Sequence, residues 1–435
     1  MEMAQNVAKN PAETSANLKR WYVLILLTLV YMASVADRNI FAILLPHIQA
    51  ELALSDTQLG LLSGVAFGIF YAVLGIPIAF MADRSNRRNI IAGALGLFSL
   101  MTVVCGFAGN FMQMLFARMG VGVGEAGTSP PTHSILSDYF PPHRRNIAMG
   151  VLNAGAFFGI LIGFVVGGAV SEQYGWRAAF YVLGVPGLLL ALVVWLTVEE
   201  PVRGASESNN SVTTVETAKV KEVFAFLWQQ KSYRHTVVLF ALASFIAYGM
   251  FTWMPTYLVR TFAMDTKQIG MMLGGVLFVS GVAGSLASGW IIDHLTRKDL
   301  RWSLWILALV ILVLMPPMVT IFMTDSATVA IACFAAPGCL MAFVTPAVIA
   351  LAQRLAPLRM RAVSSAVLFF FGALIGIGLG PVFVGVLSDV LQSWSGDESL
   401  RYALLALCPI ALWVVAHCLL GSRTLIDDIK RAESR

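Results

Sequence analysis

Long apolar stretches alternate with short polar stretches along the whole chain of 435 residues. A helix that crosses a membrane needs about 20 apolar residues, and twelve stretches reach that length. The pattern predicts an all-α membrane protein with twelve transmembrane helices, at about 20–45, 56–82, 88–109, 112–138, 145–170, 177–198, 234–260, 267–293, 301–323, 327–354, 360–389 and 399–421.

A polar stretch from Glu199 to Arg234 separates the sixth predicted helix from the seventh. We expect a linker there, with an amphipathic helix over 218–230. That helix would present four apolar residues to the membrane surface or to the bundle: Val220, Val223, Phe224 and Leu227. The predicted domains are an amino-terminal tail (1–19), a six-helix bundle (20–198), the linker (199–233), a second six-helix bundle (234–421) and a carboxyl-terminal tail (422–435).

The two predicted bundles repeat each other. The sequence DTQLG at 56–60 is similar to DTKQIG at 265–270, and DRSNRR at 83–88 is similar to DHLTRK at 293–298. The offset from Gly60 to Gly270 equals the offset from Asp83 to Asp293. Parallel repeats of six helices are an arrangement of secondary transporters, whose solute site lies near mid-membrane between the halves.

Composition and charge agree with a membrane protein. Hydrophobic residues make up 58% of the chain and charged residues only 12%, against roughly 25% charged residues in soluble domains. Lys and Arg gather in the loops on one side, which predicts that both termini and the linker are cytoplasmic and argues against a nucleic-acid partner. The other loops contain only Arg177, Arg260, Lys267 and Arg401.

No enzyme chemistry is indicated by the sequence. The five cysteines occur singly within apolar stretches, so neither a disulfide framework nor a zinc site is expected. There is no P-loop, metal-ligand spacing or nucleophile–base pattern, and we expect no cofactor. The first twenty residues do not resemble a removable signal peptide.

Two charged residues lie within the fourth predicted helix. Arg118 and Glu125 are seven residues apart, so they share one helix face about 10 Å apart along the axis. A charge at bilayer depth costs at least about 2.5–3.5 kcal/mol. We interpret the pair as a charged wall of a transport pathway, with Arg118 binding an anionic group; the alternative is an ion pair that only fastens helices together.

The first predicted helix contains Asp37 and Arg38. Burial and a neighbouring guanidinium shift the pKa of a carboxyl group in opposite directions, which can bring protonation into the physiological range. Asp37 is therefore the first candidate for proton coupling, with Arg118 or Arg38 as its partner, and Glu125 is the second. A permanently ionised structural pair is the alternative for Asp37.

Further polar and aromatic residues are candidates for the solute site and for a gate. The candidates for substrate binding, besides Arg118, are Arg38, Ser129, His133, Tyr248, Trp253 and Phe369, although packing or capping explains His133 better than a proton relay does. Charged residues in the cytoplasmic loops could close that side by bonding across the halves. These gate candidates are Asp83, Arg84, Arg87, Arg88, Asp138, Arg145, Asp293, Arg297 and Arg361.

Several motifs resemble those of the major facilitator superfamily. The loop at 83–88 and its copy at 293–298 are similar to that family's loop, with Ala79 and Asn86 where the family usually has glycine. Asp37-Arg38 and the sequence RMGVGVGEA at 118–126 resemble the spinster branch of lysolipid and sphingolipid transporters. The stretch GFVVGG at 163–168 is without the proline usual in drug antiporters of the superfamily.

The resemblance implies the major facilitator fold and transport by alternating access. We expect proton-coupled movement of a lysolipid-like or other amphiphilic anion, because a charged amino half opposite an apolar carboxyl half suits such a solute. The alternatives are a carrier of small organic anions such as sugar acids, and a sensor or scaffold that moves no solute. We expect a monomer in a bacterial inner membrane.

Overall fold

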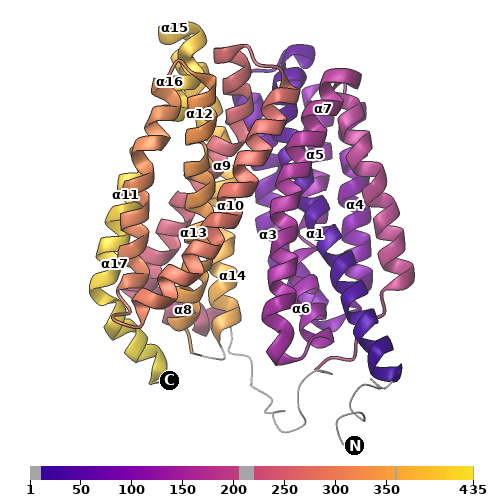
Figure 1. Ribbon diagram of the computed structural model, residues 1–435, viewed down its shortest axis with the longest axis vertical. Coiled ribbons are helices and arrows are strands. Elements are labelled where there is room, and N and C mark those ends of the chain that lie inside the picture. The colour runs from indigo at the N-terminus through magenta and orange to yellow at the C-terminus, as the bar shows by residue number, and fades with distance from the viewer. Residues whose placement is uncertain (1–10, 205–219, 358–359, 435) are drawn as a thin grey trace, which may run out of the picture.

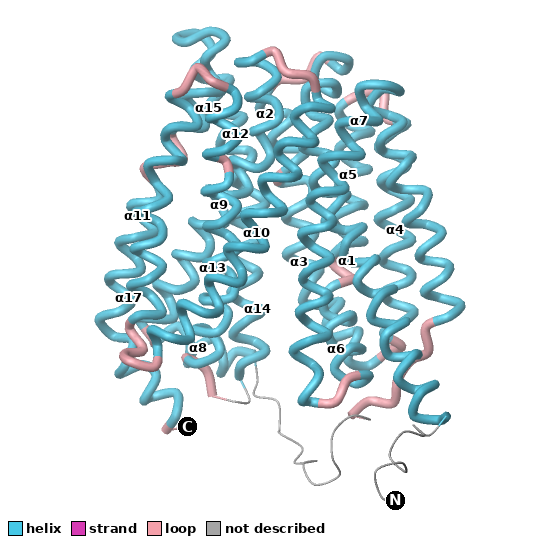
Figure 2. Tube along the Cα trace, viewed as in Figure 1, coloured by secondary structure: helices cyan, strands magenta, loops and turns pink. Residues whose placement is uncertain are grey.

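The computed structural model describes residues 11–204, 220–357 and 360–434, and every regular element in these residues is a helix (Figure 2). The helices form two groups side by side, α1–α7 in the amino half and α8–α17 in the carboxyl half (Figure 1). Helix α1 begins, and helix α17 ends, at the same end of the molecule. We call this the terminal end and the opposite one the distal end.

The helices of the amino half follow the first six predicted spans. They are α1 (Pro11–Leu52), α2 (Asp56–Ser63), α3 (Val65–Arg84), α4 (Arg87–Phe107), α5 (Phe111–Glu125), α6 (Ser129–Tyr139) and α7 (Pro142–Thr197). Helix α7 has 56 residues, more than twice the length of about 20 residues that crosses a bilayer. It contains the fifth and sixth predicted spans, joined at Gly175, whose φ of 82° suits glycine.

The carboxyl half contains the linker helix and the remaining spans. Its elements are α8 (Val220–Gln229), α9 (Lys231–Phe262), α10 (Thr266–Thr296), α11 (Trp302–Met323), α12 (Ala327–Cys333), α13 (Ala335–Arg354), α14 (Arg361–Phe371), the π-helix η2 (Gly372–Leu379), α15 (Gly380–Ser395), the 3₁₀ turn η3 (Gly396–Glu398), α16 (Ser399–Leu405) and α17 (Ile410–Glu433). The last helix continues to Glu433, beyond the predicted end at 421.

Length and hydropathy fit the predicted twelve crossings. Within the described residues, nine helices are long and apolar enough to span a membrane, and two of them, Pro142–Thr197 and Val363–Glu433, have 56 and 71 residues. Each of these two is long enough for a second crossing, which gives eleven crossings, and the fourth predicted span, which is not among the nine helices, is the twelfth. The fourth predicted span is divided into α5 and α6, because Pro130 and Pro131 have no amide hydrogen for a continuous helix and occupy the first turn of α6.

The predicted amphipathic helix of the linker is present as α8. Val223, Phe226 and Leu227 are buried against the carboxyl half. Phe224 is instead exposed and stacks on Trp228, with ring centroids 5.2 Å apart. The preceding part of the linker, 205–219, lies outside the described residues.

The halves pack closely along two seams, one between α2–α3 and η2–α15, the other between α7 and α10. Their backbones almost touch: a methyl group at Gly64 would lie 2.3 Å from the carbonyl oxygen of Gly378, and one at Gly270 would lie 2.2 Å from that of Phe164. Because α2 and α10 both begin at the distal end, these seams bring the halves together there.

Candidate transport site

Four charged side chains meet between α1 and α5 as two ion pairs. Arg118 Nη1 lies 3.3 Å from Asp37 Oδ2, and Arg38 Nη2 lies 2.6 Å from Glu125 Oε2. The predicted partnership of Asp37 with Arg118 is therefore present. Arg38 pairs with Glu125 instead, so each charge of α5 binds a charge of α1 rather than its neighbour on the same helix.

Neutral hydroxyl groups complete the binding of the two carboxylates. The Thr102 hydroxyl, on α4, donates to Asp37 Oδ1, and the Ser34 hydroxyl donates to Glu125 Oε2 over 2.7 Å. Both carboxylates are buried. Two polar atoms nevertheless lack a hydrogen-bond partner, Glu125 Oε1 and Arg118 Nε, so the buried cluster still offers one acceptor and one donor.

Aromatic rings surround both guanidinium groups. The Arg118 guanidinium carbon lies 4.2 Å from the ring centre of Phe41, and that of Arg38 lies 4.7 Å from the ring centre of Tyr71. Phe67 lies beneath both arginines, at 5.4 and 5.0 Å. Such contacts favour a planar cation held in a low-dielectric site.

The two arginines differ in accessibility. The side chain of Arg118 is 3% exposed, whereas that of Arg38 is 22% exposed. The Arg38 guanidinium also lies within electrostatic reach of Tyr248 on α9. In this conformation Arg38, rather than Arg118, is therefore the cation that borders the space between the halves.

Three of the other candidates for substrate binding have partners outside this cluster. His133 Nδ1 is 2.8 Å from the carbonyl oxygen of Ser129, one turn earlier on α6. Trp253 is fully buried and donates its indole N–H to the carbonyl of Pro381 over 2.9 Å. Phe369 is exposed and contacts Phe240 edge to face. Tyr248, by contrast, interacts with the charged residues through Arg38.

Three of the gate candidates belong to a network within the amino half. Arg87 is buried and binds Asp138 Oδ2 at 2.6 Å and Glu200 Oε1 at 2.7 Å. The backbone N–H of Arg88 donates to the same Glu200, at Oε2. This network joins the ends of α4, α6 and α7, and in this conformation it does not cross to the carboxyl half.

The remaining gate candidates lie at the terminal end. Arg145 donates to the carbonyl oxygens of Ser137 and Phe140, and the side chain of Asp83 lies outside the described part of the structure. The other four are exposed and form no ion pair within the described residues: Arg84, Asp293, Arg297 and Arg361. Their role in closing this end stays a prediction.

Five contributors to the site were not predicted from the sequence, namely Ser34, Phe41, Phe67, Tyr71 and Thr102. Thr102 and Ser99 are the two hydroxyl residues in an otherwise apolar part of α4, and Thr102 could have been noticed for that reason. Nothing distinguishes Phe67 and Tyr71 from the other aromatic residues of the spans. No group of three or more metal-ligating side chains occurs in the residues that the structure describes.

Comparison with known proteins gives concordant matches. The model of the Major Facilitator Superfamily matches residues 27–381. An MFS-type efflux pump of Mycolicibacterium smegmatis is 32% identical over 417 residues, 95% of each chain. A probable L-galactonate transporter of Escherichia coli is 26% identical over 298 residues, 66% of this chain and 64% of that protein.

Comparison with solved structures gives a match over nearly the whole chain. The crystal structure of a bacterial homologue of the human lysosomal transporter Spinster, in an inward-facing and unoccupied conformation, matches with a TM-score of 0.86. The two sequences are 29% identical, and the match covers 94% of this chain and 98% of that one. All four residues of the ion pairs lie within the matched region of the family model. The chain belongs to the major facilitator superfamily of membrane transporters, and within it the chain is similar to the spinster proteins.

Proposed function

We propose that this protein is a secondary active transporter that moves an amphiphilic anion by alternating access and couples the movement to protons. The observation that carries the proposal is the buried double ion pair of Asp37 with Arg118 and Glu125 with Arg38. Charges at bilayer depth are costly and usually functional. Here one of them, Arg38, also borders the space between the halves.

Alternating access requires that one end be closed while the other is open. The close backbone approaches between the halves at Gly64 and Gly270 belong to seams that start at the distal end, whereas the described ion pairs of the gate candidates at the terminal end stay within the amino half. The similarity to an inward-facing Spinster homologue supports assigning this conformation as inward-facing, with the terminal end toward the cytoplasm.

Proton coupling is assigned to Asp37. When ionised, its carboxylate attracts Arg118 and holds α1 against α5; when protonated, it loses that attraction. A proton can bias the two conformations only by the difference in its affinity for them. If α1 and α5 move relative to each other, the contact between Asp37 and Arg118 changes. The proton affinity of Asp37 then differs between the two conformations. Glu125, paired with Arg38, is the secondary site.

The anionic group of the solute is assigned to Arg38. A guanidinium can bind a phosphate or carboxylate through two parallel hydrogen bonds, and the neighbouring rings of Phe67, Tyr71 and Tyr248 suit an apolar portion. The gate at the terminal end is assigned to Asp83, Arg84, Asp293, Arg297 and Arg361, which would bond across the halves in the opposite conformation.

A second candidate solute is a small organic anion such as a sugar acid, because the relative named above is a probable L-galactonate transporter. The two classes are separated by competition. If the solute is amphiphilic, lysolipids should protect the purified protein against thermal unfolding and inhibit flux, while L-galactonate should do neither. The reverse result would favour the sugar acid, and absence of flux for every anion would favour a sensor or scaffold.

The test of coupling is uptake into proteoliposomes with an imposed pH gradient. Asp37→Asn keeps the shape of the side chain but cannot ionise, so we expect loss of pH-driven accumulation while ligand binding is retained. Asp427→Asn, at an exposed position on α17, is the matched control and should accumulate solute normally. If Asp37→Asn still accumulates solute in response to pH, the proton is carried elsewhere.

A further inference from the structure

The two seams of the distal end are fastened by polar clusters at equivalent positions of the sequence repeat. Ser55 caps α2 by accepting from the N–H of Gln58, and Asp265 caps α10 by accepting from the N–H of Gln268. The residues that follow the caps, Asp56 and Thr266, have the same offset as Gly60 and Gly270. Each is the centre of one cluster.

The correspondence extends to the helices opposite. A methyl group at Gly385 would lie 2.2 Å from the carbonyl oxygen of Asp56, and one at Gly168 would lie 2.3 Å from that of Thr266. Four residues after each glycine stands a carboxylate. Asp389 accepts from the backbone N–H groups of Asp56 and Thr57, and Glu172 accepts from the Thr266 hydroxyl over 2.9 Å.

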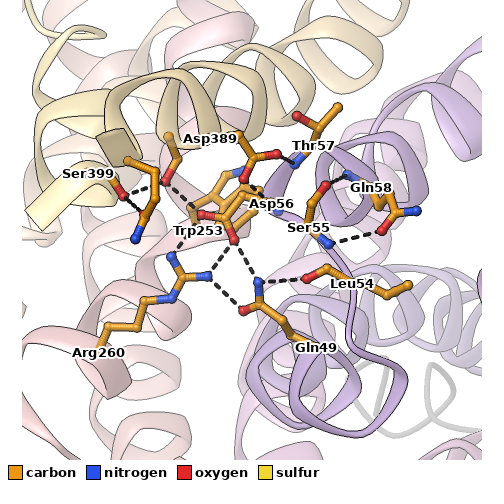
Figure 3. Close-up of polar contacts among 12 residues, drawn as sticks. Gln49, Leu54, Ser55, Asp56, Thr57, Gln58, Trp253, Arg260, Asp389 and Ser399 are labelled. Carbon is orange, nitrogen blue, oxygen red and sulfur yellow. Dashed lines mark hydrogen bonds and ion pairs between the residues drawn. The ribbon is translucent and has the colours of Figure 1, made fainter. Parts of the chain in front are cut away.

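The two clusters differ in charge. Arg260 on α9 binds both carboxylate oxygens of Asp56, with Nη1 2.8 Å from Oδ2 and Nη2 in contact with Oδ1 (Figure 3). Gln49 and Ser388 donate to the same carboxylate, over 2.8 and 2.7 Å. In the other cluster, the Thr266 hydroxyl replaces this carboxylate and is shared by His47 Nε2 at 3.1 Å and Ser171 Oγ at 3.2 Å.

The charged cluster joins α1 and α2 of the amino half to α9 and α15 of the carboxyl half. Its interactions must break for the distal end to open, because Asp56 and Arg260 belong to different halves. The side chain of Asp56 is 6% exposed and that of Arg260 is 27% exposed. A cavity of about 440 Å³ borders both, so water can solvate the separated charges and the contact can re-form.

We propose that these clusters are a duplicated latch of the distal end, in which the charged copy of Asp56, Arg260 and Asp389 sets the population of the closed conformation. The copy centred on Thr266 contributes less, because it has hydroxyl hydrogen bonds where the first has a bidentate ion pair. The inference rests on the proposed alternating access, and it adds the residues that control closure of the distal end.

The experiment measures distance rather than flux. Spin labels at Gly109→Cys and Asp325→Cys, exposed loop positions in the two halves, report opening of the distal end in a background without the five native cysteines. We expect Asp56→Asn to raise the ratio of long to short distances about tenfold, the effect of losing one well-formed charge-assisted pair. Thr266→Val, at the equivalent position, should change the ratio less than about threefold.

A charge exchange separates the latch from general damage. Arg260→Asp alone should open the distal end, and Asp56→Arg with Arg260→Asp should restore the short distance. Equal effects of Asp56→Asn and Thr266→Val, or no rescue by the exchange, would overturn the proposal. The distances are measured without solute or gradient, so this result is independent of flux. If the protein carries no solute, the distances still test the latch. If the latch proposal fails, the flux measurements still test transport.

Discussion

At the scale of single residues, the central feature is the pairing of two carboxylates with two guanidinium groups inside the amino half. A buried ion pair contributes little net stability compared with an apolar pair of the same shape, yet removal of one partner leaves an uncompensated charge. Asp37 and Glu125 are each held by one cation and one hydroxyl. Loss of a single guanidinium group should therefore lower the free energy of unfolding strongly.

We predict that Arg38→Gln lowers the free energy of unfolding by about 3 kcal/mol, because Glu125 keeps only Ser34 as a donor. Adding Glu125→Gln should recover most of this loss. The measurement is thermal unfolding of the purified variants in detergent. Arg423→Gln, at an exposed position on α17, is the control and should unfold as the parent does. Equal unfolding temperatures for the single and double variants would show that Glu125 does not depend on Arg38.

Arginine geometry gives a second prediction at this scale. Arg118 lies over the ring of Phe41 and reaches Asp37 with one terminal nitrogen. Arg118→Lys keeps the charge but loses the planar group, so we expect at least a tenfold loss of flux, about 1.4 kcal/mol. The measurement is flux into proteoliposomes at matched protein content. If the Lys variant has the flux of the parent, only the positive charge of Arg118 matters and not its planar geometry.

At the scale of the elements, the seams between the halves depend on close approach of helix backbones. Gly64 stands between α2 and α3, against Gly378 of η2. We predict that Gly64→Ala shifts the protein toward the distally open conformation, because its methyl group would lie 2.3 Å from the Gly378 carbonyl oxygen. The distance between labels at positions 109 and 325 should increase.

Gly75→Ala is the matched control for this substitution. Gly75 is on α3, and a methyl group there would meet nothing within 4 Å. Alanine favours a helix over glycine by roughly 1 kcal/mol, so this variant should keep the short distance and unfold no earlier than the parent. If both variants, or neither, lengthen the distance, the seam at Gly64 does not control closure.

At the scale of the whole molecule, the basic residues predict how the protein lies in the membrane. Because Lys and Arg gather in the loops of the terminal end, that end should face the cytoplasm. Green fluorescent protein fused after Arg435 should therefore fluoresce, and alkaline phosphatase fused there should be inactive. The phosphatase inserted after Asp325, at the distal end, should be active. The opposite pattern would place the gate candidates on the outer side.

The sequence by itself determined the features that depend on local composition. Apolar stretches of sufficient length predicted the helices, the repeat predicted two related halves, and charges within Asp37-Arg38 and the stretch 118–125 located the buried cluster. These features follow from the cost of placing polar groups in a bilayer, which acts on each segment separately.

Only the tertiary structure decided the partners. Which cation binds Glu125 depends on how α1 and α5 lie alongside each other, and neither helix alone contains that information. Likewise, Asp389 caps α2 although 332 residues separate it from Thr57. Arg87 binds Glu200 and Asp138 within its own half, and Arg38 is more accessible than Arg118. Ion pairing acts over a few ångströms in space, so it is fixed by the packing of helices and not by their order in the chain.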